Sequence, residues 1–202
     1  MGHAGAAAAA VRYLRSTGTP SPVEALPRPE LRCVGEDERA PVDQAEFRRV
    51  LGSFATGVTV ITAPAAPDED TPAGFACQSF SSLSLDPPLI AFMVGRTSTT
   101  WPRIARAGVF CVNVLAADQS ALCRAFARSG TDKFTGVEYD ASPASGSPRL
   151  AGALAWIDCT IHAVHTGGDH LIVVGRVNAL DTTDGDAAPL LFHKGRFLAH
   201  PE

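Results

Sequence analysis

Four serines, Ser79, Ser81, Ser82 and Ser84, stand between apolar residues in the segment 74–88, which reads GFACQSFSSLSLDPP. A buried strand usually avoids so many hydroxyls, because each one left without a hydrogen-bond partner costs about 1–3 kcal/mol. The pattern therefore indicates that a polar ligand meets this segment. A second interpretation is that the hydroxyls bond to neighbouring backbone at a bend, as in Ser/Thr turns.

A second group of hydroxyls lies in the segment 96–100, which reads RTSTT and directly precedes Trp101 and Pro102. Hydroxyls and free backbone N–H groups at the start of a helix make a good anion site, and a nucleotide phosphate is a suitable anion. The same residues are also typical of an ordinary helix N-cap. Both interpretations stay open from the residues alone.

A histidine closes a turn at 167–170, which reads GGDH. Because histidine titrates near neutral pH, His170 could hydrogen-bond a ligand or transfer a proton, with Asp169 beside it. The alternative is a turn histidine that is merely solvated.

Several common sites are excluded by inspection. The sequence has no GxGxxG, GxxxxGK[ST], HExxH or GxSxG motif, which argues against Rossmann dehydrogenases, P-loop enzymes, zincins and α/β-hydrolases. His162 and His165 are three residues apart on an expected strand and would point to opposite faces, so we expect no metal site. The cysteines have no zinc-site spacing and are interpreted as reduced thiols of a cytosolic protein: Cys33, Cys77, Cys111, Cys123 and Cys159.

Charge and hydropathy narrow the class of partner. Seventeen basic and 21 acidic residues give a net charge of -4, which disfavours nucleic acid as a partner. No apolar run reaches the roughly 18 residues of a transmembrane helix, and the first residues make a poor signal peptide. We therefore expect a cytoplasmic protein without a membrane partner.

Residues 1–42 differ from the rest of the chain. They hold an alanine run and several prolines and hardly any aromatic residue, so they cannot bury enough apolar area to offset their ordering entropy. The sequence predicts a flexible extension with a short helix around 6–15, acting either as a docking arm or as a solvated tail. Residues 43–202 are expected to form one domain.

The elements that position the serines and the histidine are mostly strands. A helix should start at the N-cap Asp43, followed by an acid at Glu46, and end near Gly52, with Phe47, Val50, Leu51 and Phe54 on its apolar face. Two further helices are predicted, one over 98–106 and one capped by Asp118. Strands are predicted at 57–63, 73–80, 89–94, 109–115, 153–165 and 171–180, with a closing pair at 190–192 and 197–199.

The long strands at 153–165 and 171–180 are joined by a four-residue turn and must therefore be antiparallel. Helices alternate with strands only in the middle of the chain, which does not suit a parallel sheet. The pattern favours a closed antiparallel barrel with a few helices packed outside.

Taken together, these stretches resemble the flavin reductase-like family, the FMN-binding split barrels that include the reductase components of two-component flavin-dependent monooxygenases. The similarity covers nearly all of residues 43–200. Its pieces are FxxxxGxFATGVTVITA (47–63), GFACQSFSSLSLDPPL (74–89), STTWPxI (98–104), FCVNVL (110–115), QxxLxxxFA (119–127), DKF (132–134), GDH (168–170) and PLLFxxGRF (189–197). The resemblance implies a mainly β fold, an antiparallel split β-barrel of Greek-key type with a few peripheral α-helices, and a homodimer with the flavin near the subunit interface.

The resemblance also implies an activity, the NAD(P)H-dependent reduction of FMN or FAD by hydride transfer from NADH or NADPH. The reduced flavin would then pass to a separate monooxygenase or halogenase. Hydride transfer requires two planar molecules to stack about 3–3.5 Å apart and needs no nucleophile, which agrees with the hydroxyls and single histidine found above. Two alternatives are a flavin-binding protein without reductase turnover and a small-molecule oxidase that holds FMN tightly.

Carried over by position, the resemblance gives His170 the catalytic role of holding the nicotinamide. The residues implied to line the isoalloxazine and ribityl chain are Ala76, Cys77, Gln78, Ser79, Ser82, Leu83 and Ser84. Those implied to meet the phosphate are Thr97, Ser98, Thr99, Lys133 and Phe134. Relatives commonly read TANSF where this chain reads ACQSF at 76–80, so a threonine hydroxyl and a short amide are replaced here.

Overall fold

The computed structural model describes residues 42–130, 132–183 and 185–198, so the predicted extension with its helix at 6–15 lies outside the described residues. The described helices and strands are α2 (Gln44–Leu51), β1 (Thr56–Gly57), β2 (Thr59–Ala63), β3 (Ala73–Cys77), β4 (Ser81–Leu85), β5 (Pro88–Gly95), α3 (Trp101–Ala107), β6 (Val109–Val114), α4 (Ser120–Ala127), β7 (Tyr139–Ala141), β8 (Pro148–Leu150), β9 (Ala155–Gly167), β10 (His170–Thr182), β11 (Leu191–His193) and β12 (Arg196–Phe197).

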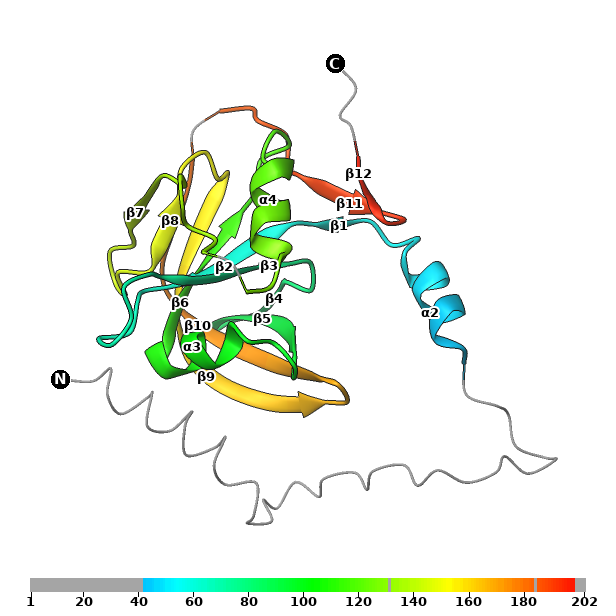
Figure 1. Cartoon of the computed structure of the whole chain (residues 1–202), viewed down its shortest axis with the longest axis horizontal. Coiled ribbons are helices and arrows are strands. Elements are labelled where there is room, and N and C mark those ends of the chain that lie inside the picture. Colours follow the sequence, from blue (N-terminus) through cyan, green and yellow to red (C-terminus); the bar gives the residue numbers. More distant parts are fainter. Residues whose placement is uncertain (1–41, 131, 184, 199–202) are drawn as a thin grey trace, which may run out of the picture.

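A seven-stranded antiparallel sheet in the order β3-β2-β6-β9-β10-β5-β4 forms the body of the molecule (Figure 1). The β9–β10 hairpin is its longest pair, and its turn contains Gly168 at a φ of 68°, where glycine is favoured. The predicted mainly β, antiparallel architecture with a few helices is confirmed. β3 and β4 follow each other in the chain, yet they lie at opposite ends of the strand order.

The predicted closure of the barrel needs correction. Within the described residues no ladder pairs β3 with β4, so the sheet is split between these two edges. Residues 78–80 cross this split, and they belong to the serine-rich segment singled out above. The predicted strand at 57–63 is also interrupted, because Val58 leaves the main ladder and its N–H donates to the Leu190 carbonyl instead.

Two apolar clusters fill the interior. In the first, the ring of Phe92 packs edge-to-face against Phe110 and Trp101, with centroid separations of 5.2 and 6.3 Å. In the second, Phe126 of α4 packs edge-to-face against Phe134 at 5.1 Å. The two helices α3 and α4 thus each bury one side against the sheet.

The starts of these two helices differ from the prediction. α3 begins at Trp101, after Thr100, which makes no side-chain cap. α4 begins at Ser120 with Gln119 as its N-cap, so the cap predicted at Asp118 is wrong. The Gln119 amide instead accepts a hydrogen bond from the Ala116 N–H and donates to the Ala151 carbonyl, which ties the helix start to a distant turn.

The first helix, α2, stands away from the sheet in Figure 1 and buries none of its residues. Its start is as predicted, since Asp43 Oδ1 accepts hydrogen bonds from the N–H groups of Ala45 and Glu46. Its apolar face, however, stays exposed, with an exposed fraction of 56% for Phe47. Phe54, predicted on the same face, lies beyond the end of the helix and is 76% exposed.

The four cysteines among the described residues, Cys77, Cys111, Cys123 and Cys159, are free and buried. Burial is the main cause that raises the pKa of the Cys111 thiol to about 12. None of the helices in the described ranges is long and apolar enough to cross a membrane.

Candidate functional site

Ser79 lies at the split between β3 and β4, and its hydroxyl joins the crossing segment to β5. Ser79 Oγ accepts a hydrogen bond from the Met93 N–H at 2.9 Å and donates to the Met93 carbonyl at 3.0 Å. This serine therefore holds the crossing segment against β5. For Ser79 the backbone-bonding interpretation of the sequence is the one that the structure shows.

Ser82, Leu83 and Ser84 lie on β4, the edge strand of the sheet. The register with β5 shifts between Ser82 and Ser84, which makes Leu83 the extra residue of a bulge, with 55% of its surface exposed. Bulges on edge strands redirect side chains toward a neighbouring space. Neither serine donates a side-chain hydrogen bond within the described residues, so both hydroxyls are available to a ligand.

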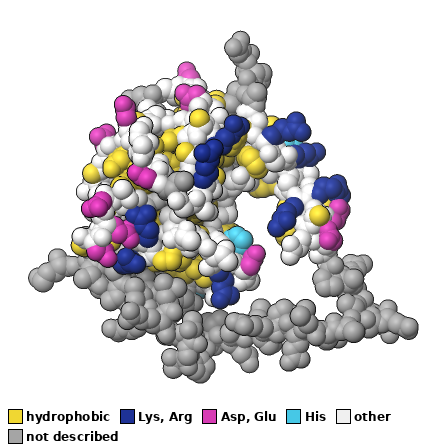
Figure 2. All heavy atoms as spheres, in the orientation of Figure 1, with side chains coloured by type: hydrophobic (Ala, Val, Ile, Leu, Met, Phe, Trp, Pro, Cys, Tyr) yellow, Lys and Arg dark blue, Asp and Glu magenta, His cyan; other side chains and the backbone are white. Residues whose placement is uncertain are grey.

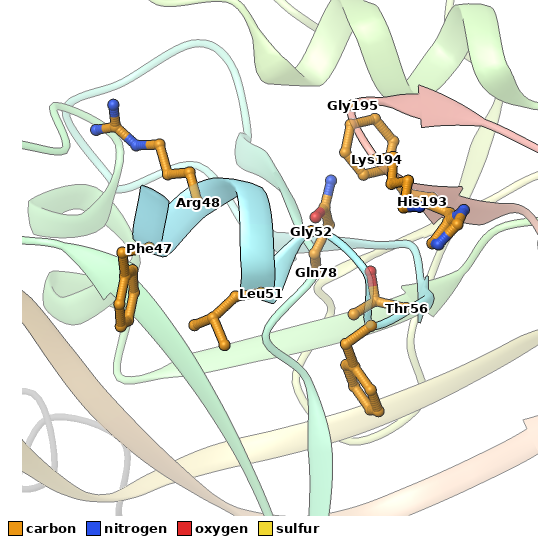
Figure 3. A pocket seen from close by; sticks show the side chains of 11 residues that line it. Phe47, Arg48, Leu51, Gly52, Thr56, Gln78, His193, Lys194 and Gly195 are labelled. Carbon is orange, nitrogen blue, oxygen red and sulfur yellow. The ribbon is translucent and has the colours of Figure 1, made fainter. Parts of the chain in front are cut away.

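A pocket of about 260 Å³, which we call the α2 pocket, begins at the carboxyl end of β3, between α2 and the β11–β12 turn (Figure 3). Phe47, Leu51 and Phe192 supply apolar lining, and Gln78 and Thr56 supply an amide and a hydroxyl. Thr56 Oγ1 is buried and has no hydrogen-bond partner among the described residues, which marks a polar position left for a ligand.

The mouth of the α2 pocket is basic. Arg48 and Lys194 line it, and neither forms an ion pair with a described carboxylate. Figure 2 shows Lys and Arg side chains on the α2 arm, which a hollow separates from the body. In a protein with a net charge of -4, such a local excess of cations favours an anionic ligand.

A second pocket, of about 310 Å³, which we call the β3 pocket, lies at the other end of the same strand. It brings together two of the predicted phosphate residues, Thr99 and Lys133, with Gly74 of β3 and Arg103 of α3. Gly74 and Gln78 are four residues apart, so the two pockets are separated by roughly 13 Å along β3.

The other predicted phosphate residues are placed differently. Ser98 Oγ accepts a hydrogen bond from the Trp101 N–H at 3.2 Å and so steadies the turn before α3. Phe134 is only 8% exposed, and its ring packs between Phe126 and Tyr139 in the second apolar cluster. Its ring is thus part of the core, while its neighbour Lys133 faces the β3 pocket.

His170 opens β10 directly opposite Gly95, the last residue of β5. A Cβ atom placed on Gly95 would lie 4.0 Å from both His170 Nε2 and Thr97 Oγ1, so these two polar atoms face one small space. The backbone holds this turn in place, because the Arg96 N–H donates to the Asp169 carbonyl at 2.9 Å.

The Asp169 carboxylate fixes the orientation of the imidazole. His170 Nδ1 lies 2.7 Å from Asp169 Oδ1, and this hydrogen bond, followed by the charge of the ring, lowers the pKa of Asp169. An ionised carboxylate can only accept a hydrogen bond, so Nδ1 carries the proton that it donates. Nε2 is therefore the nitrogen left to meet a ligand.

Thr56 and Arg103 are among the pocket residues that were not predicted from the sequence. Thr56 belongs to the FATGV stretch that carries the resemblance, so its position in a motif was the available signal. No sequence pattern singles out Arg103, because a helix arginine is usually solvent-exposed. Only the folded structure shows that it lines a pocket.

An antiparallel split barrel with two pockets along one strand is the class that fold and site define. Residues 51–200 match the family described as the flavin reductase like domain. The chain is 49% identical over 156 residues to the reductase subunit of a flavin-dependent monooxygenase from Rhodococcus jostii, covering 77% of each chain. The protein belongs to the flavin reductase-like family.

Solved structures agree with this assignment. Component B of nitrilotriacetate monooxygenase from Mycobacterium thermoresistibile is 46% identical, with a TM-score of 0.72 over 77% of this chain and 85% of that one. The NADH:FAD oxidoreductase of Streptomyces globisporus in complex with NAD and FAD fragments is 35% identical, with a TM-score of 0.73 over 85% of this chain and 98% of that one.

Proposed function

We propose that this protein is a flavin reductase that oxidises NADH or NADPH, reduces FMN or FAD, and releases the reduced flavin to a separate monooxygenase or halogenase. The observation that carries the proposal is the α2 pocket, where a buried and unpartnered Thr56 hydroxyl and the Gln78 amide meet apolar walls and a basic mouth. The apolar walls, the amide and the hydroxyl suit a flat polar ring, and the basic mouth attracts an anionic ligand.

The residues present fit a flavin laid along β3. Backbone groups of Ala76 and Cys77, with the Gln78 amide, would hold the ring, since the Ala76 side chain offers no polar atom. The free hydroxyls of Ser82 and Ser84 would meet the polar chain. Thr97, Ser98, Thr99 and Lys133 would meet the phosphate. Ser98 would contribute through its hydroxyl proton, because its backbone N–H donates to the Gly95 carbonyl. When bound, the flavin would supply the hydride acceptor, and the residues named above would hold it in place.

His170 would orient the nicotinamide. Its Nδ1–H is held by Asp169, so Nε2 is presented to the space that it shares with Thr97. A histidine ring with a fixed orientation lowers the entropy cost of stacking the nicotinamide on the flavin. Holding the two rings in this arrangement is the main task of an enzyme in hydride transfer. No residue of the chain needs to donate or remove a proton in this step.

The activity is tested by mixing purified protein with NADH or NADPH and with FMN or FAD, and following the nicotinamide absorbance. We expect oxidation that requires added flavin. Absence of oxidation with all four pairs would refute the reductase, and oxidation without added flavin would indicate a tightly held FMN instead.

The role of His170 is tested by His170→Ala. We expect kcat to fall about five- to tenfold, the equivalent of one hydrogen bond, with little change in flavin affinity. His162→Ala is the matched control, because His162 is an exposed histidine in the middle of β9. Unchanged NADH kinetics in His170→Ala would count against the role.

The proposal includes a homodimer of the domain formed by residues 43–202. The exposed apolar face of α2 and the exposed Leu83 and Leu85 of edge strand β4 are two uncovered surfaces, and a second copy related by a twofold axis can cover both. The free thiols of the described cysteines support a cytoplasmic location.

A further inference from the structure

The β3 pocket holds two cations close together. Lys133 Nζ donates hydrogen bonds to the carbonyls of Gly74 and Phe126, both at 3.0 Å, which uses two of its three donors. Burial is the main cause that lowers the pKa of Lys133, and the positive charge of Arg103 adds to it. An anion that contacts both cations would relieve the repulsion between them, and Glu69 contacts Arg103 alone.

Arg103 is held in a fixed orientation before any ligand arrives. Its Nε donates to Glu69 Oε2 at 2.6 Å, and its Nη2 donates to the Thr71 carbonyl at 2.6 Å. Among the described residues, Nη1 has no hydrogen-bond partner. A guanidinium held in this way can bind a phosphate without a further loss of side-chain entropy.

The acidic groups near this pocket already have partners. Asp132 is the one carboxylate in the described lining, and its two oxygens accept hydrogen bonds from the Phe134 N–H and the Thr135 hydroxyl. Glu69 is paired with Arg103 and lies 3.4 Å from Arg106. Because Glu69 pairs with Arg103, Lys133 is the lining cation that forms no ion pair with a described carboxylate, and its third donor stays available to an anion.

The size of the β3 pocket indicates more than a single phosphate. Its volume of about 310 Å³ reaches the lower end of the roughly 300–1,000 Å³ typical of small-molecule sites. The cations come from separate segments, Arg103 from α3 and Lys133 from the stretch after α4, and Thr99 and Thr100 add hydroxyls. Two cations on two walls match a diphosphate better than a terminal monophosphate.

We propose that Arg103 and Lys133 bind the diphosphate of FAD in the β3 pocket, and that the protein therefore prefers FAD to FMN. This inference rests on the proposed flavin function, because it places the flavin ring toward Gln78 at the other end of β3. Arg103 becomes a specificity-determining residue, which distinguishes a dinucleotide from a mononucleotide.

The test is the variant Arg103→Gln, with Arg106→Gln as the matched control. Arg106 lies on the same helix and also contacts Glu69, but it does not line the pocket. Dissociation constants for FAD, FMN and riboflavin are measured by titration calorimetry, and KM for NADH is measured by steady-state kinetics. We expect the Kd of FAD to rise about ten- to hundredfold, that of FMN to rise less and that of riboflavin to stay unchanged.

Three results would overturn the inference. If the Kd of FAD and the Kd of FMN rise equally, the pocket binds a monophosphate only. If the Kd of riboflavin rises by the same factor, Arg103→Gln only disturbs the fold. A higher KM for NADH with unchanged flavin affinities would assign the cations to the nicotinamide dinucleotide. A second measurement needs no variant, because added salt should weaken wild-type binding of FAD more than that of riboflavin.

The failure of this inference can be told from failure of the proposed function. Riboflavin lacks phosphate, so wild-type reduction of riboflavin by NADH reports the reductase activity without the β3 pocket. If riboflavin is reduced but FAD and FMN bind equally well, only the diphosphate inference fails.

Discussion

The helices α2 and α4 have the same length of eight residues and are stabilised in opposite ways. α2 has a side-chain N-cap from Asp43 and an ion pair between Glu46 and Arg49, and it buries nothing. α4 has no side-chain cap, yet it buries Cys123 and Phe126. Local interactions define the first helix, and tertiary packing defines the second.

This difference shows what each helix contributes to the molecule. Phe126 packs so closely on the sheet that a Cβ on Gly74 would come within 2.7 Å of its ring, so α4 fixes the position of β3 at the β3 pocket. The apolar side chains of α2 are not buried by any of the described residues. A helix with an uncovered apolar face is expected to be completed by another molecule.

The largest effect is expected for Phe126→Ala, which should lower the free energy of unfolding by about 3–5 kcal/mol, because it leaves a cavity beside Phe134. Urea denaturation at protein concentrations low enough to keep the chain monomeric measures the change. Phe47→Ala on α2 is the matched control and should cost less than about 0.5 kcal/mol there. Equal costs for both substitutions would show that α2 is packed in its own chain after all.

The second effect concerns assembly. The double variant Phe47→Ala, Phe54→Ala should shift the proposed homodimer toward monomer, because it removes the exposed rings of Phe47 on α2 and of Phe54 just after it. Sedimentation velocity over a range of protein concentrations gives the dissociation constant, which we expect to rise at least tenfold. Arg49→Ala, on the same helix, serves as the control. An unchanged dissociation constant would remove α2 from the interface.

The contrast between the helices also explains which parts of the fold the sequence could predict. Asp43 and Glu46 act within four residues of each other, and the start of α2 was predicted correctly. The start of α4 depends on Gln119 binding the carbonyl of Ala151, a contact between distant residues, and a local rule chose Asp118 instead. The opening of the barrel between β3 and β4 is likewise a long-range property.

The candidate site shows the same contrast between residues in short motifs and residues whose position depends on long-range contacts. Short motifs singled out His170, Thr99 and Lys133, and the structure places Thr99 and Lys133 in one pocket, while their roles toward a ligand stay predictions. Phe134 was predicted to meet the phosphate because it belongs to the DKF stretch, but its ring packs in the core. Arg103 was missed because its role depends on the distant Glu69 and Thr71, which fix the guanidinium at the pocket wall.

The smallest predicted effect tests whether the Asp43 N-cap stabilises α2. Asp43→Ala removes the acceptor of two N–H groups and should destabilise α2 by about 1 kcal/mol, within the range of 0.5–2 kcal/mol usual for N-caps. Hydrogen exchange of the α2 amides measures this loss as faster exchange confined to the helix. Asp118→Ala is the control, because α4 has no side-chain cap there, and its amides should exchange at the wild-type rate. If Asp118→Ala accelerates exchange in α4 as much as Asp43→Ala does in α2, then local capping supports both helices and packing alone does not define α4.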